Sequence, residues 1–126
     1  MDVRSANSIP WAAAPADNFT GRVLFGPISG DGTVNMLGVS FEPAARTDWH
    51  SHPEGQLLYV VSGVGRVGDD DGTTVEVSAG DTVYAEPGQV HWHGAAPHSP
   101  MTHLSITTGG DTEWLPRKVT DDEYSG

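Results

Sequence analysis

The sequence predicts an all-β fold of one domain, either a sandwich or a small barrel, and three observations support this. The chain has 126 residues, which suits one domain with one modest core. Its 16 glycines and 9 prolines do not cluster but separate short stretches rich in β-branched and aromatic residues. No helical period of useful length appears. Short strands joined by tight turns are therefore expected throughout.

The expected strands follow one another along the whole chain. They cover residues 20–25, 35–42, 47–51, 56–62, 65–68, 73–77, 82–86, 90–94 and 101–107. Each is short and bounded by Gly, Pro or Asp turns such as DDDG and SAGD, which is typical of a sandwich or barrel rather than of βαβ units.

Two terminal segments flank the barrel, which is assigned to residues 19–110. Residues 1–18 are expected to form an extended arm that is available to pack on a neighbouring chain. Residues 111–126 form the predicted tail, in which VTDDEYSG can make one helical turn capped by Thr120.

The composition excludes several kinds of partner and chemistry. Six Lys and Arg against 17 Asp and Glu give a net charge of −11, the wrong sign for binding nucleic acid or anionic lipid. The absence of cysteine rules out disulfides, thiolate metal sites and cysteine nucleophiles. No signal-peptide apolar region is present, and the longest apolar run, LLYVV at 57–61, is far below the roughly 20 residues of a membrane helix. We expect a cytoplasmic protein that binds neither nucleic acid nor membranes.

Two histidine pairs with the same spacing are the main functional signal. His50 and His52 precede a Pro-Glu-Gly turn, and His91 and His93 form the second pair. Side chains at i and i+2 of a strand point to the same face, so two adjacent strands can direct four imidazoles into one space. Because the chain has only six histidines, a metal site explains the pairs better than four separate structural roles do. Gln56 opens the next strand, where its amide oxygen can fold back toward the first pair.

Two glycine-rich or acidic motifs are better explained as turns. GVGRVG, at 63–68, has the spacing of a dinucleotide-binding loop, but DDDGTTVEV follows it instead of a helix, so a tight hairpin is expected. DDDG, at 69–72, begins like a calcium loop, yet Gly80 stands where the bidentate acid belongs.

Core packing is the expected role of three tryptophans, Trp49, Trp92 and Trp114. The first two alternate with histidines and should face away from a metal. His98, in a loop between prolines, is expected to be exposed and inert.

The first histidine pair resembles one of the two sequence motifs of the cupin family, whose fold is a jelly-roll β-sandwich or barrel. That motif runs His-x-His, three or four residues, an acidic ligand, six residues and Gly. Here the matching residues are His50, His52, Gln56 and Gly63.

The second pair resembles the other cupin motif, which runs Gly, five residues, Pro-x-Gly, two residues and His. Gly80, Gly88 and His91 match it. Two positions depart from the motif, because Glu86 stands where Pro is usual and Ala95 replaces the terminal Asn. Neither departure removes a metal ligand.

The chain as a whole is similar to small single-domain cupins that act as manganese-dependent, (R)-selective hydroxynitrile lyases. The likeness rests on Gln56 in place of the usual Glu and on the two segments HWHGAAP and MTHL. It extends from PADNFTG at Pro15 to VTDDEY ending at Tyr124. The resemblance implies that the metal ligands are His50, His52, Gln56 and His91, and that the open side is lined by His93 and His103. It also favours Mn(II), six-coordinate with two open positions, over the Fe(II), Ni(II), Co(II) and Zn(II) that imidazole sites also accept.

The ligand set itself suggests a chemistry. Four neutral ligands leave a divalent cation its full charge, so the open positions become strong Lewis acid sites for a hydroxyl or carbonyl oxygen. A cyanohydrin presents such an oxygen and, on losing its proton, collapses to an aldehyde or ketone and cyanide. His103 is the expected base, since histidine titrates near about pH 6.5, and His93 the expected donor to cyanide, although the two roles are interchangeable.

Three function classes stay open at this point. The first is a lyase that releases aldehyde and HCN from a cyanohydrin. The second is a cupin dioxygenase in which Fe or Mn binds oxygen at the open positions, and the third is a non-catalytic cupin that binds a small molecule. In each case the partner is a small molecule. We also expect a homodimer or homotetramer, because association removes unpaired sheet edges.

Overall fold

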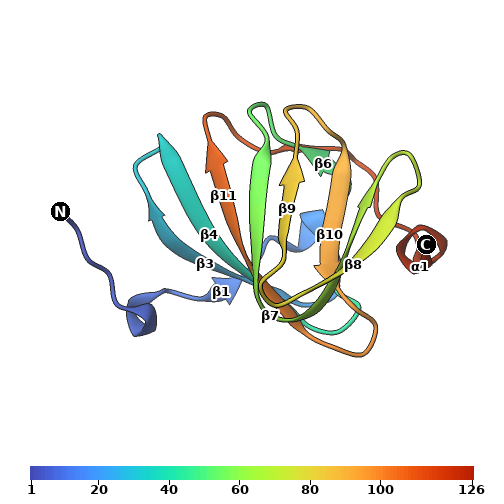
Figure 1. Cartoon of the computed structure of the whole chain (residues 1–126), viewed down its shortest axis with the longest axis horizontal. Helices are drawn as coiled ribbons and strands as arrows, with labels where there is room; N and C mark the ends of the chain where they lie inside the picture. Colours follow the sequence, from blue (N-terminus) through green and yellow to red (C-terminus); the bar gives the residue numbers. More distant parts are fainter.

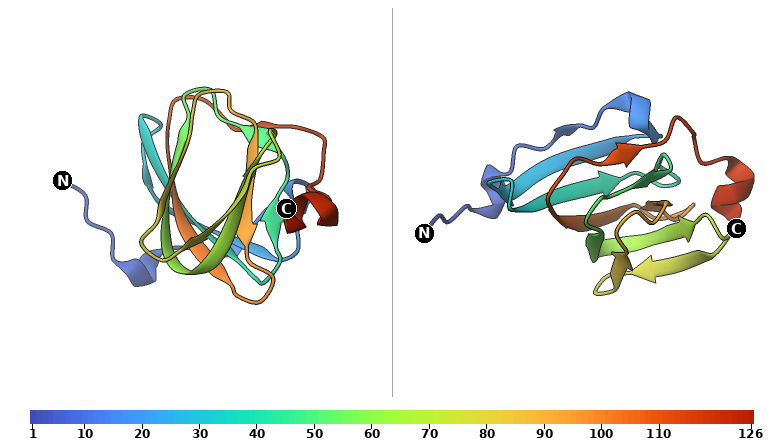
Figure 2. Two further views of the ribbon diagram at one scale, coloured as in Figure 1. Left: turned by 45° about the vertical axis from the view of Figure 1, so that its right-hand side comes forward. Right: turned by 90° about the horizontal axis from the view of Figure 1, so that it is seen from above.

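The computed structural model describes residues 1–126 and shows an antiparallel sheet that curls into a barrel (Figure 1; Figure 2). Its strands are β1 (Ala12–Ala13), β2 (Phe19–Thr20), β3 (Val23–Gly30), β4 (Val34–Phe41), β5 (Arg46–Thr47), β6 (His50–Ser51), β7 (Gln56–Asp69), β8 (Thr74–Ser78), β9 (Thr82–Ala85), β10 (His91–Ala95), β11 (Met101–Thr108) and β12 (Glu113–Trp114). The helical segments are short, namely the 3-10 turns η1 (Ala6–Ser8) and η2 (Ala16–Asn18), and α1 (Asp121–Ser125). The all-β prediction is confirmed.

The long strand β7 belongs to both halves of the sheet. Its first part pairs with β11 and β9, and its second part pairs with β10 and β8. Between these parts Gly63 has a φ of 79°, and a Cβ there would lie 1.9 Å from the carbonyl oxygen of Pro100. Glycine is therefore required at this bend. The two strands expected at 56–62 and 65–68 are one strand, because the bend does not interrupt the pairing.

The expected strand at 47–51 is divided into β5 and β6. The backbone N–H of Asp48 donates to the carbonyl of Asn18, and that of Trp49 donates to the carbonyl of Arg117. These partners come from distant parts of the chain, so the backbone leaves the sheet ladder for two residues. A local sequence pattern does not contain this information.

Two apolar clusters fill the fold. The larger one lies inside the barrel and consists of Phe19, Val23, Val39, Phe41, Ala45, Val60, Val77, Ala95 and Met101. The smaller one lies outside, where Trp49 and Trp92 pack with Val119 and Tyr124. The packing role expected for Trp49 and Trp92 is confirmed. Trp114 also packs against the larger cluster, with its ring 5.6 Å from that of Phe19, and in addition lies against His50 with the centroids 4.8 Å apart.

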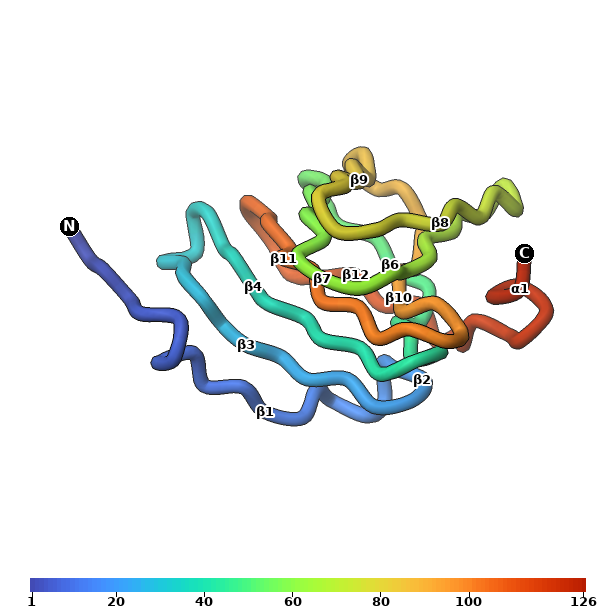
Figure 3. Tube along the Cα trace, turned by 60° about the horizontal axis from the view of Figure 1, so that its bottom comes forward, coloured from blue at the N-terminus to red at the C-terminus, as the bar shows by residue number.

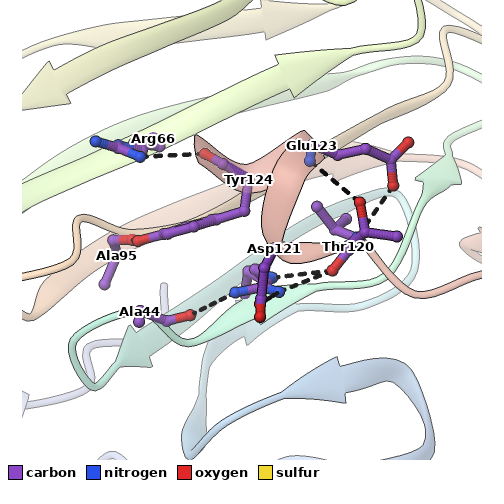
Figure 4. Close-up of polar contacts among 9 residues, drawn as sticks. Ala44, Arg66, Ala95, Thr120, Asp121, Glu123 and Tyr124 are labelled. Atoms are coloured by element: carbon purple, nitrogen blue, oxygen red, sulfur yellow. Dashed lines mark hydrogen bonds and ion pairs between the residues drawn. The ribbon is translucent and has the colours of Figure 1, made fainter. Parts of the chain in front are cut away.

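The tail is fixed to the barrel through α1 (Figure 4). Thr120 caps this helix in a reciprocal capping box with Glu123, which confirms the predicted helical turn. The Tyr124 hydroxyl donates to the carbonyl of Ala95. The Tyr124 ring lies 4.5 Å from the guanidinium carbon of Arg46 and 5.1 Å from that of Arg66. The tail thus packs against β5, β7 and β10, and the last of these carries His91 and His93.

Removing the Tyr124 side chain is expected to destabilise the protein strongly. Tyr124→Ala should lower the free energy of unfolding by about 3 kcal/mol, because it deletes a buried aromatic side chain and its contacts with two cations. Tyr124→Phe removes only the hydroxyl, so about 1 kcal/mol should be lost. Urea unfolding monitored by circular dichroism measures both values. Equal stability of Tyr124→Ala and the wild type would show that the tail is not anchored in this way.

The arm is only partly free of the barrel. Ala12–Ala13 pairs with β3 as the outermost strand β1, and Figure 3 shows β1, β3, β4, β11 and β7 lying side by side. Trp11 lies over Gly26 and Gly38, where an added Cβ would come within 2.7 Å of its ring. The first residues extend away from the barrel (Figure 1).

As for membrane insertion, no helix here combines the length and the apolar character that crossing a bilayer requires.

Candidate metal centre

The curled sheet brings together six residues that the sequence analysis singled out. All are buried: His50 in β6, His52 after it, Gln56 in β7, His91 and His93 in β10, and His103 in β11. The register of β10 and β6 places His91 opposite His50, and their ring centroids lie 4.4 Å apart. The two histidine pairs therefore share one space. His98 lies apart, exposed in its loop.

Backbone carbonyls fix the orientation of one histidine from each pair. The Nδ1 atom of His50 lies 2.9 Å from the carbonyl of Asp48, and that of His91 lies 2.8 Å from the carbonyl of Gln89. A carbonyl only accepts, so each Nδ1 carries the proton and donates. Each Nε2 is left with a free lone pair, which is the form in which imidazole binds a metal.

The amide of Gln56 meets one of these lone pairs. Its Nε2 atom donates to the Ser105 hydroxyl at 2.7 Å, which leaves its Oε1 atom 3.0 Å from Nε2 of His91. Both facing atoms are acceptors, so no hydrogen bond joins them. A cation between such atoms would remove their repulsion.

A further lone pair lies close by. The Nε2 atom of His52 is buried and has no hydrogen-bond partner, and burying a polar atom in this state costs free energy. Its ring centroid is 5.2 Å from that of His50 and 5.8 Å from that of His91. The orphaned nitrogen and the opposed acceptors together fit a divalent cation, because nitrogen and amide oxygen are suitable donors.

His93 lies close enough to the expected ligands to be a ligand itself, a role that the resemblance did not imply. The ligand atoms of His50, His91 and His93 all lie within 4.8 Å of one another, which makes these three histidines a possible metal site by themselves. The Nε2 atom of His93 is 3.2 Å from Nε2 of His50, and its Nδ1 atom is 2.9 Å from Nε2 of His103. Because Nε2 of His50 only accepts, Nε2 of His93 donates to it and Nδ1 of His93 accepts from Nε2 of His103 while no cation is bound. A cation on the His50 lone pair would allow the row to reverse, with Nδ1 of His93 donating to His103.

All five of these histidines are held in the neutral form. Burial lowers the pKa of His103 to about 3 and, with the nearby His91, the pKa of His52 to about 4. Burial also lowers the pKa of His50, His91 and His93, and neighbouring imidazoles add to this for His50 and His93. Neutral rings are the ones that accept a metal ion or a proton.

A cavity of about 390 Å³ opens onto the cluster. Its walls include His50, His52, Gln56 and His93, but neither His91 nor His103. His103 contacts the far side of His93, and His91 contacts Gln56 and His50. Apolar side chains from the barrel and the tail, among them Phe19, Phe25, Leu37, Val39 and Trp114, share the rest of the walls with polar ones, among them Arg4, Asn35, Thr47 and Ser105. No Asp or Glu lines the cavity. A bound divalent cation would therefore keep its full charge.

Ser105 is a site residue that the sequence analysis missed. The available signal was its position, because Ser105 is two residues after His103 on the same face of β11. Trp114 was expected to pack in the core only, and it also reaches the cavity because the tail returns to pair β12 with β6. No pattern near Trp114 predicts that pairing.

Ser105→Ala is expected to weaken metal binding tenfold to about a hundredfold, the usual cost of losing a residue that orients a ligand. The hydroxyl accepts from Nε2 of Gln56 and so directs the amide oxygen toward His91. Titration calorimetry with Mn(II) measures the change. Ser40→Ala is the matched control, because the Ser40 hydroxyl accepts from Thr102 away from the cavity. Equal affinity in the two variants would show that Ser105 does not orient Gln56.

Comparison with known sequences gives two matches. Residues 38–107 match the family described as Cupin domain. The chain is also 41% identical to the (R)-mandelonitrile lyase of Granulicella tundricola, over 98% of each chain.

Comparison with solved structures agrees with these matches. A cupin-like protein from Thermotoga maritima superimposes with a TM-score of 0.85 at 39% identity, covering 90% of each chain. The polyketide cyclase RemF from Streptomyces resistomycificus has a TM-score of 0.79, covering 99% of this chain and 91% of its own. At 17% identity, the likeness to RemF shows a common fold alone.

Proposed function

The chain belongs to the cupin family, and on that premise we propose that it is a metal-dependent lyase that splits cyanohydrins into an aldehyde or ketone and hydrogen cyanide. The similarity to a mandelonitrile lyase over nearly all of both chains supports this proposal. Mandelonitrile is the cyanohydrin of benzaldehyde. A cavity of about 390 Å³ with aromatic walls is in the size range of small-molecule sites.

The observation that carries the proposal is the neutral donor set. His50, His52, His91 and Gln56 would hold the metal, and no carboxylate lies among them or along the cavity. A divalent cation here, Mn(II) in our proposal, would supply a Lewis acid that polarises the hydroxyl oxygen of the substrate and makes its proton easier to remove.

The histidines beside this donor set would move the proton. His93 lines the cavity whereas His103 does not, so we assign the base to His93 and a positioning role to His103. With Nδ1 of His93 donating to Nε2 of His103 at 2.9 Å, Nε2 of His93 is free to accept the hydroxyl proton. This assignment gives His93 the base role that the sequence suggested for His103, and His103 positions His93 instead.

The remaining step returns the proton. As the carbon–cyanide bond breaks, its electrons leave with cyanide and the oxygen lone pair forms the carbonyl. Burial and His103 lower the pKa of His93, so the protonated ring is unfavourable and gives its proton to cyanide. Apolar walls from Phe19, Phe25 and Trp114 would exclude water while charge is separated.

The test is an assay of purified protein reconstituted separately with Mn(II), Fe(II) and Zn(II). We expect cyanide release from mandelonitrile above the metal-free control. Gln56→Glu keeps an oxygen ligand but adds a negative charge, so we expect the metal to stay bound and the rate to fall at least about tenfold. Oxygen uptake with diketones or phenols, without cyanide release, would instead identify a dioxygenase. If neither reaction occurs with any of the three metals, the remaining function is that of a cupin that binds a small molecule without catalysis.

A further inference from the structure

The outer face of one half of the sheet carries no charged residue, although the chain has a net charge of −11. Figure 1 shows β3, β4, β11, β7 and β9 side by side. None of these strands contains Asp, Glu, Lys or Arg, if β7 is counted as far as its bend at Gly63. In a sequence with 17 acidic residues, a charge-free surface of this width indicates a surface that is covered.

The side chains on this face are large and apolar where β7 and β9 meet. On β7 the inward Gln56, Leu58 and Val60 alternate with exposed residues. These exposed residues and their neighbour on β9 are Leu57, Tyr59, Val61 and Tyr84, which are 40%, 43%, 47% and 62% exposed. They leave on the order of 400 Å² of apolar surface open, the size at which a patch on a monomer is often functional.

The register of the strands makes these residues one continuous patch. Leu57 lies opposite Tyr84 on one side and Ile106 on the other, and Tyr59 lies opposite Leu104. The chain itself covers a different part of the face, where Trp11 lies over Gly26 and Gly38 of β3 and β4. The part on β11, β7 and β9 has no such cover.

We propose that this patch is the interface between two copies of the chain, related by a two-fold axis. Two strongly acidic molecules repel each other, but this face allows them to meet without opposing acidic side chains. A second copy brings the same uncharged apolar surface, as a two-fold contact requires. A stable dimer buries about 800 Å² per partner, of which these four side chains would supply roughly half. The contact lies on the face of the sheet, not on its edges as the sequence analysis expected.

The test compares two exposed valines under sedimentation velocity. Val61, in the patch, and Val75, on β8, are 47% and 49% exposed, so Val61→Glu and Val75→Glu add the same charge at equal exposure. The wild type is expected to sediment as a multiple of the 13.3 kDa chain. Val61→Glu should raise the dissociation constant at least a hundredfold, because a two-fold contact presents each new charge twice, and Val75→Glu should have no effect.

A second variant and a fold check keep the test decisive. Tyr84→Asp places a charge on β9 and should dissociate the assembly as Val61→Glu does, with unchanged circular dichroism in both. A tetramer that falls to dimers in these variants also supports the patch as one of its interfaces. A monomeric wild type at about 100 µM, or an assembly that survives both substitutions, would overturn the proposal. These results do not depend on whether the protein cleaves cyanohydrins.

Discussion

His91→Ala is expected to abolish metal binding and to reduce cyanide release from mandelonitrile by about a thousandfold or more. His91 holds a central position because its Nδ1 atom donates to the carbonyl of Gln89 and its Nε2 atom faces Oε1 of Gln56 at 3.0 Å. It also lies opposite His50 in the strand register. Removing the ring therefore takes away one donor and leaves the others without a common centre.

Metal content by mass spectrometry and the rate under saturating Mn(II) measure this effect. His98→Ala is the matched control, because His98 is exposed in its loop and away from the cavity, so both quantities should stay at the wild-type level. A His91→Ala protein that keeps one metal ion per chain, or more than a tenth of the wild-type rate, would contradict the assignment.

His93→Gln is expected to slow cyanide release by a hundredfold to about ten-thousandfold, the range for losing a general base, while the metal stays bound. His93 lines the cavity, and its Nδ1 atom is 2.9 Å from Nε2 of His103. Glutamine is polar and of similar length, but it does not accept a proton near neutral pH. The rate should therefore fall without loss of the site.

Metal content decides between two roles for His93. The ligand atoms of His50, His91 and His93 lie within 4.8 Å of one another, so His93 has the position of a possible ligand as well as of a base. Loss of the metal from His93→Gln would assign it to the ligand set and remove it as the base. Retention of both metal and full activity would exclude both roles.

The part of the site that follows from local alternation could be predicted from the sequence. Because His50 and His52, and His91 and His93, are two residues apart, each pair was expected on one face of its strand. The structure places both pairs inside the barrel. Turn residues likewise separated the strands well enough to identify an all-β fold, and Thr120 with Glu123 marked the start of α1.

What depends on distant partners could not be predicted in this way. The division of the strand at 47–51 arises from carbonyls of Asn18 and Arg117, and Trp114 reaches the cavity only because the tail pairs with β6. The order of His93 in front of His103 depends on how β10 and β11 face each other across the barrel. Spacing along each strand does not show which of the two histidines faces the cavity, so the sequence leaves their roles interchangeable.

In our proposal, imidazoles from separate strands and one carboxamide surround a single divalent cation inside the barrel. Anomalous diffraction at the manganese edge, from crystals grown with Mn(II), tests it most directly. We expect one peak per chain within bonding distance of Nε2 of His50, Nε2 of His91 and Oε1 of Gln56. A cavity without a peak, or a peak bound only by surface carboxylates, would contradict it.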